Sequence, residues 1–345
     1  MQTITIAVIG DNFILTENFI TEIKKNLPKN SYSYKFISAT HDWPNVPMQY
    51  DKEIQEFTGD TSNTLKLLKD ADIAAIHMAP ITNEILEKSS KLKLISTARG
   101  GVVNVNLESA TRHNVIVTNA PGRNARAVAE FTIALMIDLT KGITNGHYNL
   151  ASKKFWKTDL YDYKKITKNL HTSTVGLIGM GRVGTITAKL LQSLGSQVLC
   201  YDPYIKNSSH NQPFESCDLP YLLQKADIVS LHARHSNQKN KALLGEKELQ
   251  LMKRGAFLIQ TSRSALLDYA ALYRQLKNGH LSGAALDVYP QEPIPHTDPL
   301  FKLENIILTP HIAGSSKDSA ITGIKTAASS IGHFLKEEKI ENQIN

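Results

Sequence analysis

The feature that most constrains the fold is the stretch VGLIGMGRVG, residues 175–184, whose three glycines follow the pattern Gly-x-Gly-x-x-Gly. Surface turns produce such a pattern by chance, so its surroundings decide what it means. A short apolar run at 174–178 precedes the glycines and predicts a buried parallel strand. Apolar residues then repeat at helical spacing, which predicts an amphipathic helix. These residues are Ile186, Leu190 and Leu194. Gly195 stands where a left-handed C-cap favours glycine, and a second strand, QVLCYD, ends at Asp202.

Strand, glycine turn, helix, strand and acid in this order favour a dinucleotide-binding unit over an ordinary strand-turn-helix without a ligand. Gly179 permits the tight turn, Gly181 leaves room for a pyrophosphate, and Gly184 lets the helix pack on the strand. The helix N-terminus offers N–H groups to the phosphates. The residues of this loop predicted to bind the cofactor are Gly179, Gly181, Arg182, Val183 and Gly184. Asp202 matches the carboxylate that binds the adenine-ribose hydroxyls and repels a 2′-phosphate, so we expect NAD rather than NADP.

Length and composition exclude several classes of protein. The 345 residues predict two domains, and 41% hydrophobic and 21% charged residues indicate a globular chain. No apolar run approaches the ~20 residues of a membrane span, and the N-terminus does not resemble a signal peptide. With only Cys200 and Cys217 present, we expect no disulfide framework, no zinc site and a cytoplasmic location. The net charge of +7 reflects either attraction of anionic ligands or general surface basicity, without a nucleic-acid-binding motif.

Strand-like and helix-like segments alternate along the chain, which predicts an α/β fold with two Rossmann- or flavodoxin-like domains and mostly parallel sheets. Before the glycine loop, the strand-like segments are TITIAVIG, YSYKFIS, ADIAAIHM, KLKLISTA and NVIVTNA. After it, they are DIVSLH, AFLIQTS, GAALDVY and NIILTPH. Between the two groups, residues 127–154 form a long helix-like stretch. A last helix near 316–336 is too small for a domain. We therefore expect a discontinuous substrate-binding domain of residues 1–118 and 316–345 and an NAD-binding domain of residues 119–315.

Polar residues fall at the carboxyl ends of the later strands, where open α/β sheets bind ligands. Arg263 follows AFLIQTS, Asp287 and Glu292 lie in and after GAALDVY, and His311 closes NIILTPH. His311 could exchange the proton of a substrate hydroxyl, with Glu292 orienting the imidazole. Arg263 offers a planar fork of donors to a carboxylate. An acid–base histidine, an arginine and a nicotinamide make a hydride-transfer site for a 2-hydroxy or 2-keto acid.

At these residues the sequence resembles the D-isomer-specific 2-hydroxyacid dehydrogenases, in their phosphoglycerate dehydrogenase-like branch. The markers are NAPGRNARAVAEF, VGLIGMGRVG with YDP, TSRSALLD, GAALDVYPQEP and LTPHIAGS. The resemblance implies that Arg263, Glu292 and His311 are catalytic, that Arg263 binds the substrate, and that Asp287 holds the nicotinamide carboxamide. It also implies a homodimer and a cleft that closes on its ligands. Because 34 residues follow His311, we expect no C-terminal regulatory domain.

Other positions lie at strand ends or depart from the family pattern. We expect His232, Ala233 and Thr261 beside the cofactor, while His232 and His235 are structural or near the cofactor rather than metal ligands. Ser264 replaces a usual glycine, which would strain the loop if that position needs a positive φ. Arg234 replaces a usual proline and either reaches the cofactor phosphates or the cleft, or faces solvent.

The loop ARGGVVNVN holds the substrate-binding residues that we expect from the resemblance, Arg99, Gly100 and Gly101. The two glycines suit close approach of the backbone to a carboxylate. Arg99 either favours a second acidic group, such as a phosphate or another carboxylate, or is a structural arginine bonded to loop carbonyls. The reaction predicted is NAD-dependent interconversion of a D-2-hydroxy acid and its 2-keto acid, with 3-phosphoglycerate or a related acidic hydroxy acid as a candidate substrate. The alternatives are an NADH-sensing regulatory protein of the same fold and a formate dehydrogenase.

Overall fold

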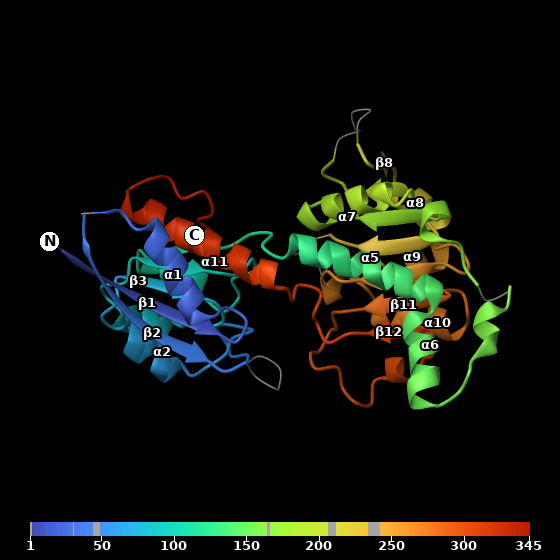
Figure 1. Ribbon diagram of the computed structural model, residues 1–345, viewed down its shortest axis with the longest axis horizontal. Helices are drawn as coiled ribbons and strands as arrows, with labels where there is room; N and C mark the ends of the chain where they lie inside the picture. The colour runs from blue at the N-terminus through green and yellow to red at the C-terminus, as the bar shows by residue number, and fades with distance from the viewer. Residues whose placement is uncertain (1, 30, 44–48, 164–165, 206–211, 234–241) are drawn as a thin grey trace. The chain divides into compact units, whose positions relative to one another are not determined.

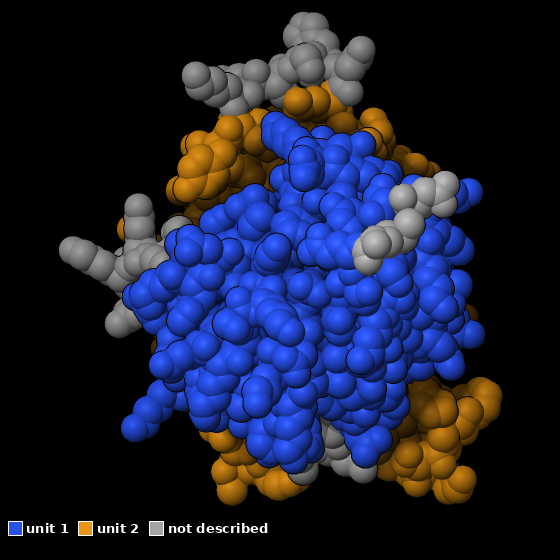
Figure 2. All heavy atoms as spheres, turned by 90° about the vertical axis from the view of Figure 1, so that its left-hand side faces the viewer, with its two compact units in different colours: residues 1–124, 316–345 blue, residues 125–315 orange. Residues whose placement is uncertain are grey.

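The computed structural model describes residues 2–29, 31–43, 49–163, 166–205, 212–233 and 242–345. The chain divides into two compact units, which Figure 2 shows in different colours. Unit 1 comprises residues 1–124 and 316–345, and unit 2 comprises residues 125–315. Each unit holds a parallel sheet between layers of helices (Figure 1), so the predicted α/β fold with two mostly parallel sheets is confirmed.

The sheet of unit 1 has five parallel strands in the order β2-β1-β3-β4-β5. They are β1 (Thr3–Asp11), β2 (Ser33–His41), β3 (Ile73–Ile76), β4 (Leu94–Thr97) and β5 (Ile116–Thr118). The central strands are apolar, which suits a sheet that is covered on both faces. Along β1, Ile6 and Val8 enter one core cluster while Ala7 and Ile9 enter another, because successive side chains alternate between faces.

Helices cover both faces of this sheet. On one face α1 (Thr16–Asn26) packs beside α11 (Lys317–Leu335), as Figure 1 shows. Phe19 of α1 and Ile331 of α11 meet Ile6 in a common core cluster. On the other face lie α2 (Thr61–Leu68), α3 (Asn83–Lys88) and α4 (Leu107–Arg112), which contribute Leu68, Ile85 and Ala110 to the second cluster.

The C-terminal segment completes unit 1. The hydroxyl of Ser96 donates to the carbonyl of Ala327 in α11 at 2.9 Å. After the helix, Val117 N donates to Asn345 Oδ1 at 2.7 Å, and Ile344 N donates to Val117 O at 3.0 Å. Residues from the two ends of the chain therefore share one core, and the helix expected near 316–336 packs in it.

The sheet of unit 2 has seven parallel strands in the order β12-β11-β10-β9-β6-β7-β8. They are β6 (Thr174–Ile178), β7 (Gln197–Tyr201), β8 (Glu215–Ser216), β9 (Ile228–Leu231), β10 (Phe257–Gln260), β11 (Gly283–Leu286) and β12 (Ile306–Leu308). From β6 the chain runs outward through β7 and β8 and then returns to β9 on the other side. This reversal is the topological switch point of a doubly wound sheet.

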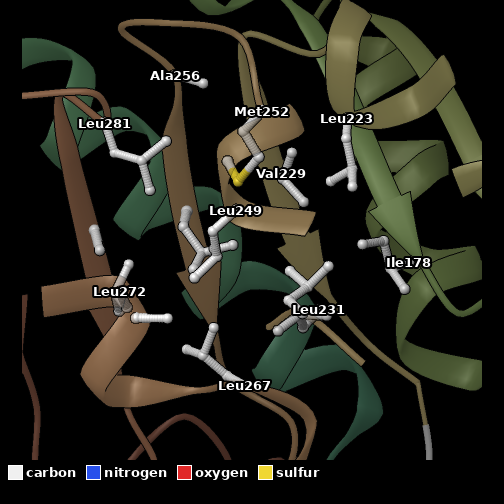
Figure 3. Close-up of a cluster of buried hydrophobic side chains, with 14 of the residues drawn as sticks. Ile178, Leu223, Val229, Leu231, Leu249, Met252, Ala256, Leu267, Leu272 and Leu281 are labelled. Carbon is white, nitrogen blue, oxygen red and sulfur yellow. The ribbon is translucent and has the colours of Figure 1, made fainter. Parts of the chain in front are cut away.

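Two layers of helices also enclose this second sheet. The helices α5 (Ala125–Lys141) and α7 (Arg182–Ser193) share one cluster, in which Met136 and Leu191 meet Leu177 of β6. The opposite face carries α8 (Leu219–Lys225), α9 (Glu246–Leu251) and α10 (Tyr269–Lys277). Figure 3 shows the cluster that they form with the strands, including Leu231, Leu249 and Leu272.

The helix-like stretch at 127–154 is not one helix. The first helix, α5, ends at Lys141 because Gly142 takes a left-handed φ of 65°. The chain continues as α6 (Ile143–His147) and a π-helical turn, η1 (Tyr148–Ser152). Four short 3-10 segments complete the elements of the described residues. They are η2 (Thr158–Tyr161), η3 (Leu170–Thr172), η4 (Ser264–Leu266) and η5 (Pro299–Lys302).

Candidate active site

The glycine loop joins β6 to α7 in unit 2. Gly179 has a φ of 97°, and a Cβ placed there would lie 2.4 Å from Ala233 N. A Cβ on Gly184 would lie 2.2 Å from the carbonyl oxygen of Gly179. Both positions therefore exclude any side chain. Gly181, the N-cap of α7, differs because a Cβ there would meet no atom within 4 Å among the described residues. Packing within the described chain does not demand a glycine at 181.

Asp202 follows β7 and lies against the glycine loop. Its Oδ2 accepts a hydrogen bond from Met180 N at 2.7 Å, and its Oδ1 accepts one from Tyr204 N at 2.9 Å. These two bonds fix the carboxylate beside the loop. Each carboxylate oxygen has two lone-pair sites, so capacity remains for hydroxyl donors.

The other residues expected near the cofactor lie in unit 2, after its strands or at the start of α7. His232 N donates to Ile178 O at 2.7 Å, and the ring Nε2 lies 3.0 Å from the hydroxyl of Ser230. Burial lowers the pKa of His232 to about 4, so the imidazole is neutral at neutral pH. The hydroxyl of Thr261, after β10, lies 3.0 Å from that of Thr132 in α5. At the start of α7, Arg182 is exposed and Val183 half-buried. Arg234 and His235 lie outside the described residues.

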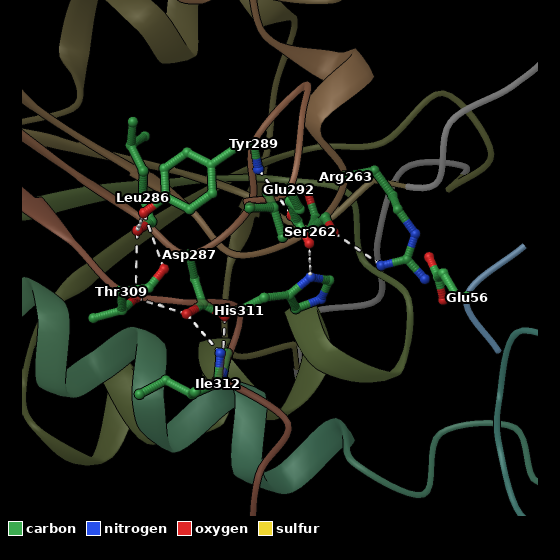
Figure 4. A network of polar contacts seen from close by, with 12 residues as sticks. Glu56, Ser262, Arg263, Leu286, Asp287, Tyr289, Glu292, Thr309, His311 and Ile312 are labelled. Atoms are coloured by element: carbon green, nitrogen blue, oxygen red, sulfur yellow. Dashed lines mark hydrogen bonds and ion pairs between the residues drawn. The ribbon is translucent and has the colours of Figure 1, made fainter. Parts of the chain in front are cut away.

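The structure brings Arg263, Glu292 and His311 together at the carboxyl ends of the neighbouring strands β10, β11 and β12, as Figure 4 shows. Nδ1 of His311 lies 2.7 Å from Oε2 of Glu292. The other carboxylate oxygen of Glu292, Oε1, accepts a hydrogen bond from Tyr289 N at 3.0 Å. The carboxylate is thus held from both sides, and it fixes which ring nitrogen of His311 carries the hydrogen toward it.

The positive charges of His311 and Arg263 stabilise the carboxylate of Glu292. Burial alone would raise the pKa of Glu292, but the hydrogen bond and charge of His311 oppose it. The Tyr289 N–H and the charge of Arg263 act in the same direction, so the pKa of Glu292 lies below its ordinary value. Glu292 is therefore a carboxylate at neutral pH. The His311 side chain is 50% exposed, and Arg263 is also exposed, so both can meet a ligand.

Asp287 is fully buried and anchors the loop that carries His311. Its Oδ1 accepts hydrogen bonds from the hydroxyl of Thr309 at 2.6 Å and from Ile312 N at 2.9 Å. Its Oδ2 accepts a third, from Ala313 N at 2.8 Å. All three donors lie in residues 309–313, around His311, and Figure 4 shows Thr309 and Ile312. Within the chain, this carboxylate therefore positions the loop of the histidine.

His311 itself has a left-handed backbone, with a φ of 53°. Such a conformation costs a residue with a Cβ about 1–2 kcal/mol, which the hydrogen bonds of Asp287 offset. Ser264, where the sequence suggested strain, does not have a positive φ. It instead begins the 3-10 turn η4, so the condition under which Ser264 would strain the loop is not met.

Arg99, Gly100 and Gly101 belong to unit 1, where they follow β4. The side chain of Arg99 contacts its neighbours at three points, with Nη2 2.5 Å from Glu56 Oε2 and Nη1 bonded to Glu56 O and Asn104 Oδ1. These contacts favour the structural interpretation of Arg99. Gly101 faces open space among the described residues, and a Cβ on Gly100 would lie 3.6 Å from Ala120 O.

A second polar cluster in unit 1 was not among the predicted site residues. It consists of Asp11 at the end of β1, His77 just after β3 and Arg123 after β5. The available signal was weak, because each residue stands alone in the sequence at the end of a different strand.

Comparison with known proteins agrees with this geometry. The family model described as "D-isomer specific 2-hydroxyacid dehydrogenase, NAD binding domain" matches residues 133–313. The glyoxylate reductase of Korarchaeum cryptofilum is 32% identical over 283 residues, which are 81% of this chain and 85% of the relative. The chain belongs to the D-isomer-specific 2-hydroxyacid dehydrogenase family. It therefore binds a nicotinamide cofactor, as the family resemblance of the sequence implied.

Two further members of the D-2-hydroxyacid dehydrogenase family show the extent of the likeness. The D-3-phosphoglycerate dehydrogenase of Methanocaldococcus jannaschii is 35% identical over 297 residues, 85% of this chain and 55% of that protein. The chain thus spans about half the length of that relative. The D-isomer specific 2-hydroxyacid dehydrogenase of Lactobacillus delbrueckii ssp. bulgaricus, solved in its NAD complexed form, superposes with a TM-score of 0.78. The superposition covers 99% of this chain and 100% of that chain, and 23% of the aligned residues are identical. The likeness therefore shows the fold.

No described helix has both the length and the apolar composition needed to cross a bilayer. Among the described residues, no three His, Cys, Asp or Glu side chains gather as a metal ion would require.

Proposed function

We propose that the chain is an NAD-dependent oxidoreductase that interconverts a D-2-hydroxy acid and its 2-keto acid. The observation that carries this proposal is the 2.7 Å contact between Glu292 and His311, with Arg263 beside them, at one edge of a dinucleotide-binding sheet. We further propose 3-phosphoglycerate or a related acidic hydroxy acid as substrate. In this proposal unit 2 binds the cofactor, and unit 1 contributes substrate-binding residues, including Gly100 and Gly101.

The residues of unit 2 fit a dinucleotide. The open space at Gly181 and the N–H groups at the start of α7 suit a pyrophosphate. Asp202 supports NAD over NADP because its carboxylate would repel a 2′-phosphate. An Asp202→Asn variant keeps an acceptor for Met180 N and removes the charge. It should raise the preference for NADPH over NADH, measured as the ratio of their dissociation constants, by roughly tenfold or more. An unchanged ratio would remove the support for NAD.

The bound nicotinamide would supply or accept the hydride. His311 would hold the proton at Nε2, the ring nitrogen opposite Glu292, and give it to the carbonyl oxygen in the reductive direction. Glu292 would stabilise the protonated imidazole. Arg263 would bind the substrate carboxylate and stabilise the charge that develops on the oxygen. Asp287 would keep His311 in place and contact the carboxamide of the cofactor.

The test is loss of NADH absorbance with a panel of 2-keto acids, including glyoxylate, hydroxypyruvate and 3-phosphohydroxypyruvate. We expect turnover of at least one of these acids. In a His311→Gln variant kcat should fall by ~100-fold or more while NADH binding is kept. His113, an exposed histidine of unit 1, provides the matched control as His113→Gln. NADH binding without turnover of any acid would instead support the sensing protein.

We also propose a homodimer. The segment 148–163 of unit 2 exposes several large aromatic side chains, which is unusual for the surface of a monomer. Their exposed fractions are 53% for Tyr148, 57% for Phe155, 75% for Trp156, 95% for Tyr161 and 88% for Tyr163. Light scattering after gel filtration should give twice the mass of 38.3 kDa. A Trp156→Ser, Tyr161→Ser variant should shift toward the monomer, and a wild-type monomer would overturn the proposal.

A further inference from the structure

The sheet of unit 1 has its own switch point. From β1 the chain goes to β2 on one side and then to β3 on the other. Open α/β sheets with this strand order bind ligands outside the carboxyl ends of the strands, at the place where the order reverses. Asp11 is the last residue of β1, and His77 is the first residue after β3. A polar pair therefore occupies the position where the topology favours a ligand.

This pair is buried and fully oriented. The Oδ1 atom of Asp11 accepts hydrogen bonds from Phe13 N at 2.9 Å and Ile14 N at 2.8 Å. Its Oδ2 lies 2.6 Å from Nδ1 of His77, and both side chains are 1% exposed. Burial lowers the pKa of His77 to about 4, against the opposing effect of Asp11. The imidazole is thus neutral at neutral pH, donates through Nδ1 and presents Nε2 as an acceptor.

Arg123 donates a hydrogen bond to this acceptor. Its Nη2 donates to His77 Nε2 at 3.1 Å, and its guanidinium carbon lies 5.2 Å from the ring centroid of Phe13. Its stem passes α11 at Gly323, where a Cβ would lie 3.0 Å from Arg123 Cδ. The chain Asp11–His77–Arg123 therefore fixes both the position and the direction of the guanidinium.

One nitrogen of this guanidinium has no hydrogen-bond partner in the described part of the chain. Nη1 of Arg123 is buried and has no hydrogen-bond partner among the described residues. Leaving a charged donor unpaired in the interior is costly, so such groups are normally paired or bind a ligand. Burial lowers the pKa of Arg123 to about 10, with a contribution from Arg99 that Asp11 partly opposes. Arg123 is therefore still a cation at neutral pH.

The neighbouring cation, Arg99, is less suited to bind an anion of the ligand. Arg99 lies in an ion pair with Glu56. The segment that ends at Arg123 lies beside the same loop, residues 98–106, which the family resemblance assigns to substrate. Asn119 Nδ2 donates to Gly100 O at 2.9 Å, and Ala120 N donates to Arg99 O at 2.8 Å. The segment that leads to Arg123 is thus bonded to the loop of Gly100 and Gly101.

We propose that Arg123 binds a second anionic group of the substrate, a phosphate or a carboxylate, and that Asp11 and His77 are its positioning residues. The inference rests on the proposed function, in which Arg263 binds the carboxylate next to the reacting carbon. It assigns to Arg123 the second-anion role that the sequence suggested for Arg99. The substrate is then an acidic 2-hydroxy acid with two negative groups.

The first experiment compares kcat/KM on keto acids with one and two anionic groups. Glyoxylate carries one, 3-phosphohydroxypyruvate adds a phosphate, and 2-oxoglutarate adds a carboxylate, so the two dianions distinguish the anions. In Arg123→Gln the values for the preferred dianion should fall by about 10- to 100-fold, as expected for a lost charged hydrogen bond. The value for glyoxylate should change less than about threefold. Arg126→Gln, an exposed arginine three residues along, is the matched control.

A second experiment does not depend on turnover. Calorimetry of the full chain with 3-phosphoglycerate, without cofactor, should show binding that Arg123→Gln loses and Arg123→Lys partly keeps. His77→Gln should weaken this binding less than Arg123→Gln does. Loss of binding in a chain that turns over no keto acid would support the subsite and refute the proposed reaction. Equal losses on glyoxylate and both dianions, or unchanged binding in Arg123→Gln, would overturn the subsite and leave the reaction in place.

Discussion

Glu292 and His311 come from loops after two neighbouring strands, β11 and β12, and a 2.7 Å contact joins Oε2 of the first to Nδ1 of the second. The register of a parallel sheet thus sets the distance between an acid and a base that lie 19 residues apart. Because Tyr289 N holds the other carboxylate oxygen, the acid cannot turn away from the imidazole without breaking a second bond.

The first prediction concerns the pH profile of a Glu292→Gln variant. In the proposed reaction, the wild-type carboxylate would stabilise the protonated form of His311, which would donate the proton during reduction. Without that charge, the imidazole loses its proton at lower pH. The pH at which half of the reductive rate is lost should therefore move down, by about one unit or more, in profiles of kcat/KM. A profile that stays in place would show that Glu292 does not act through His311.

The second prediction tests Asp287 as the anchor of the histidine loop. Asp287→Asn keeps one acceptor oxygen but replaces the other with an NH2 group that cannot accept, and it removes the charge that all three donors share. Thr309→Val removes only one of the three donors. The free energy of unfolding should fall by about 2–4 kcal/mol in the first variant and about 1 kcal/mol in the second. The kcat should fall in the same order, because the left-handed backbone of His311 is less well held. Denaturant titration and steady-state kinetics measure both quantities. Equal effects of the two variants would contradict the anchoring role.

The third prediction separates folding from ligand binding in the glycine loop. Gly184→Ala places a Cβ 2.2 Å from a backbone oxygen, so it should destabilise unit 2 and lower the unfolding midpoint. Gly181→Ala meets no atom within 4 Å, so its thermal unfolding should match that of the wild type. Its affinity for NADH should nevertheless fall about tenfold or more, because the methyl group occupies the space left for the pyrophosphate. Normal NADH affinity in Gly181→Ala would place the pyrophosphate elsewhere.

The fourth prediction follows from the buried imidazole of His77. Its pKa is about 4 in the folded chain and about 6.5 when unfolded, so the unfolded chain binds a proton that the folded chain does not. Stability should therefore decrease as pH falls from about 6.5 to 4, by roughly 3 kcal/mol for this group. His232 titrates in the same direction within the same window. Denaturation curves of His77→Gln should show a shallower decrease than those of His113→Gln, and identical slopes would contradict the burial argument.

Much of the fold could be predicted because the buried strands are continuous apolar runs and the helices carry clear caps. The left-handed Gly195 after α7 was expected, and its φ is 86°. The strand β8 could not be predicted, because two residues carry no periodicity. The stretch at 127–154 contains good helix formers on both sides of Gly142, and only the backbone shows that the helix ends there.

The grouping of Arg263, Glu292 and His311 could be predicted because parallel strands bring their carboxyl ends to one edge. The Asp11–His77–Arg123 chain could not, since its members follow strands that are far apart in the sequence. The left-handed backbone of His311 also has no local signal, because it depends on the bonds that Asp287 makes from another strand. The pairing of Arg99 with Glu56 likewise depends on a loop 43 residues away.

The docking of α11 in unit 1 has a consequence for biosynthesis. The ribosome makes residues 1–124 first, yet α1 alone covers Ile6 and Val8 of β1 until Ile324 and Ile331 of α11 have been made. Unit 2 is contiguous and needs no later segment, so it can finish folding while the first sheet still awaits its cover. During translation, the earliest part of this chain is therefore the last to become protected from chaperones and proteases.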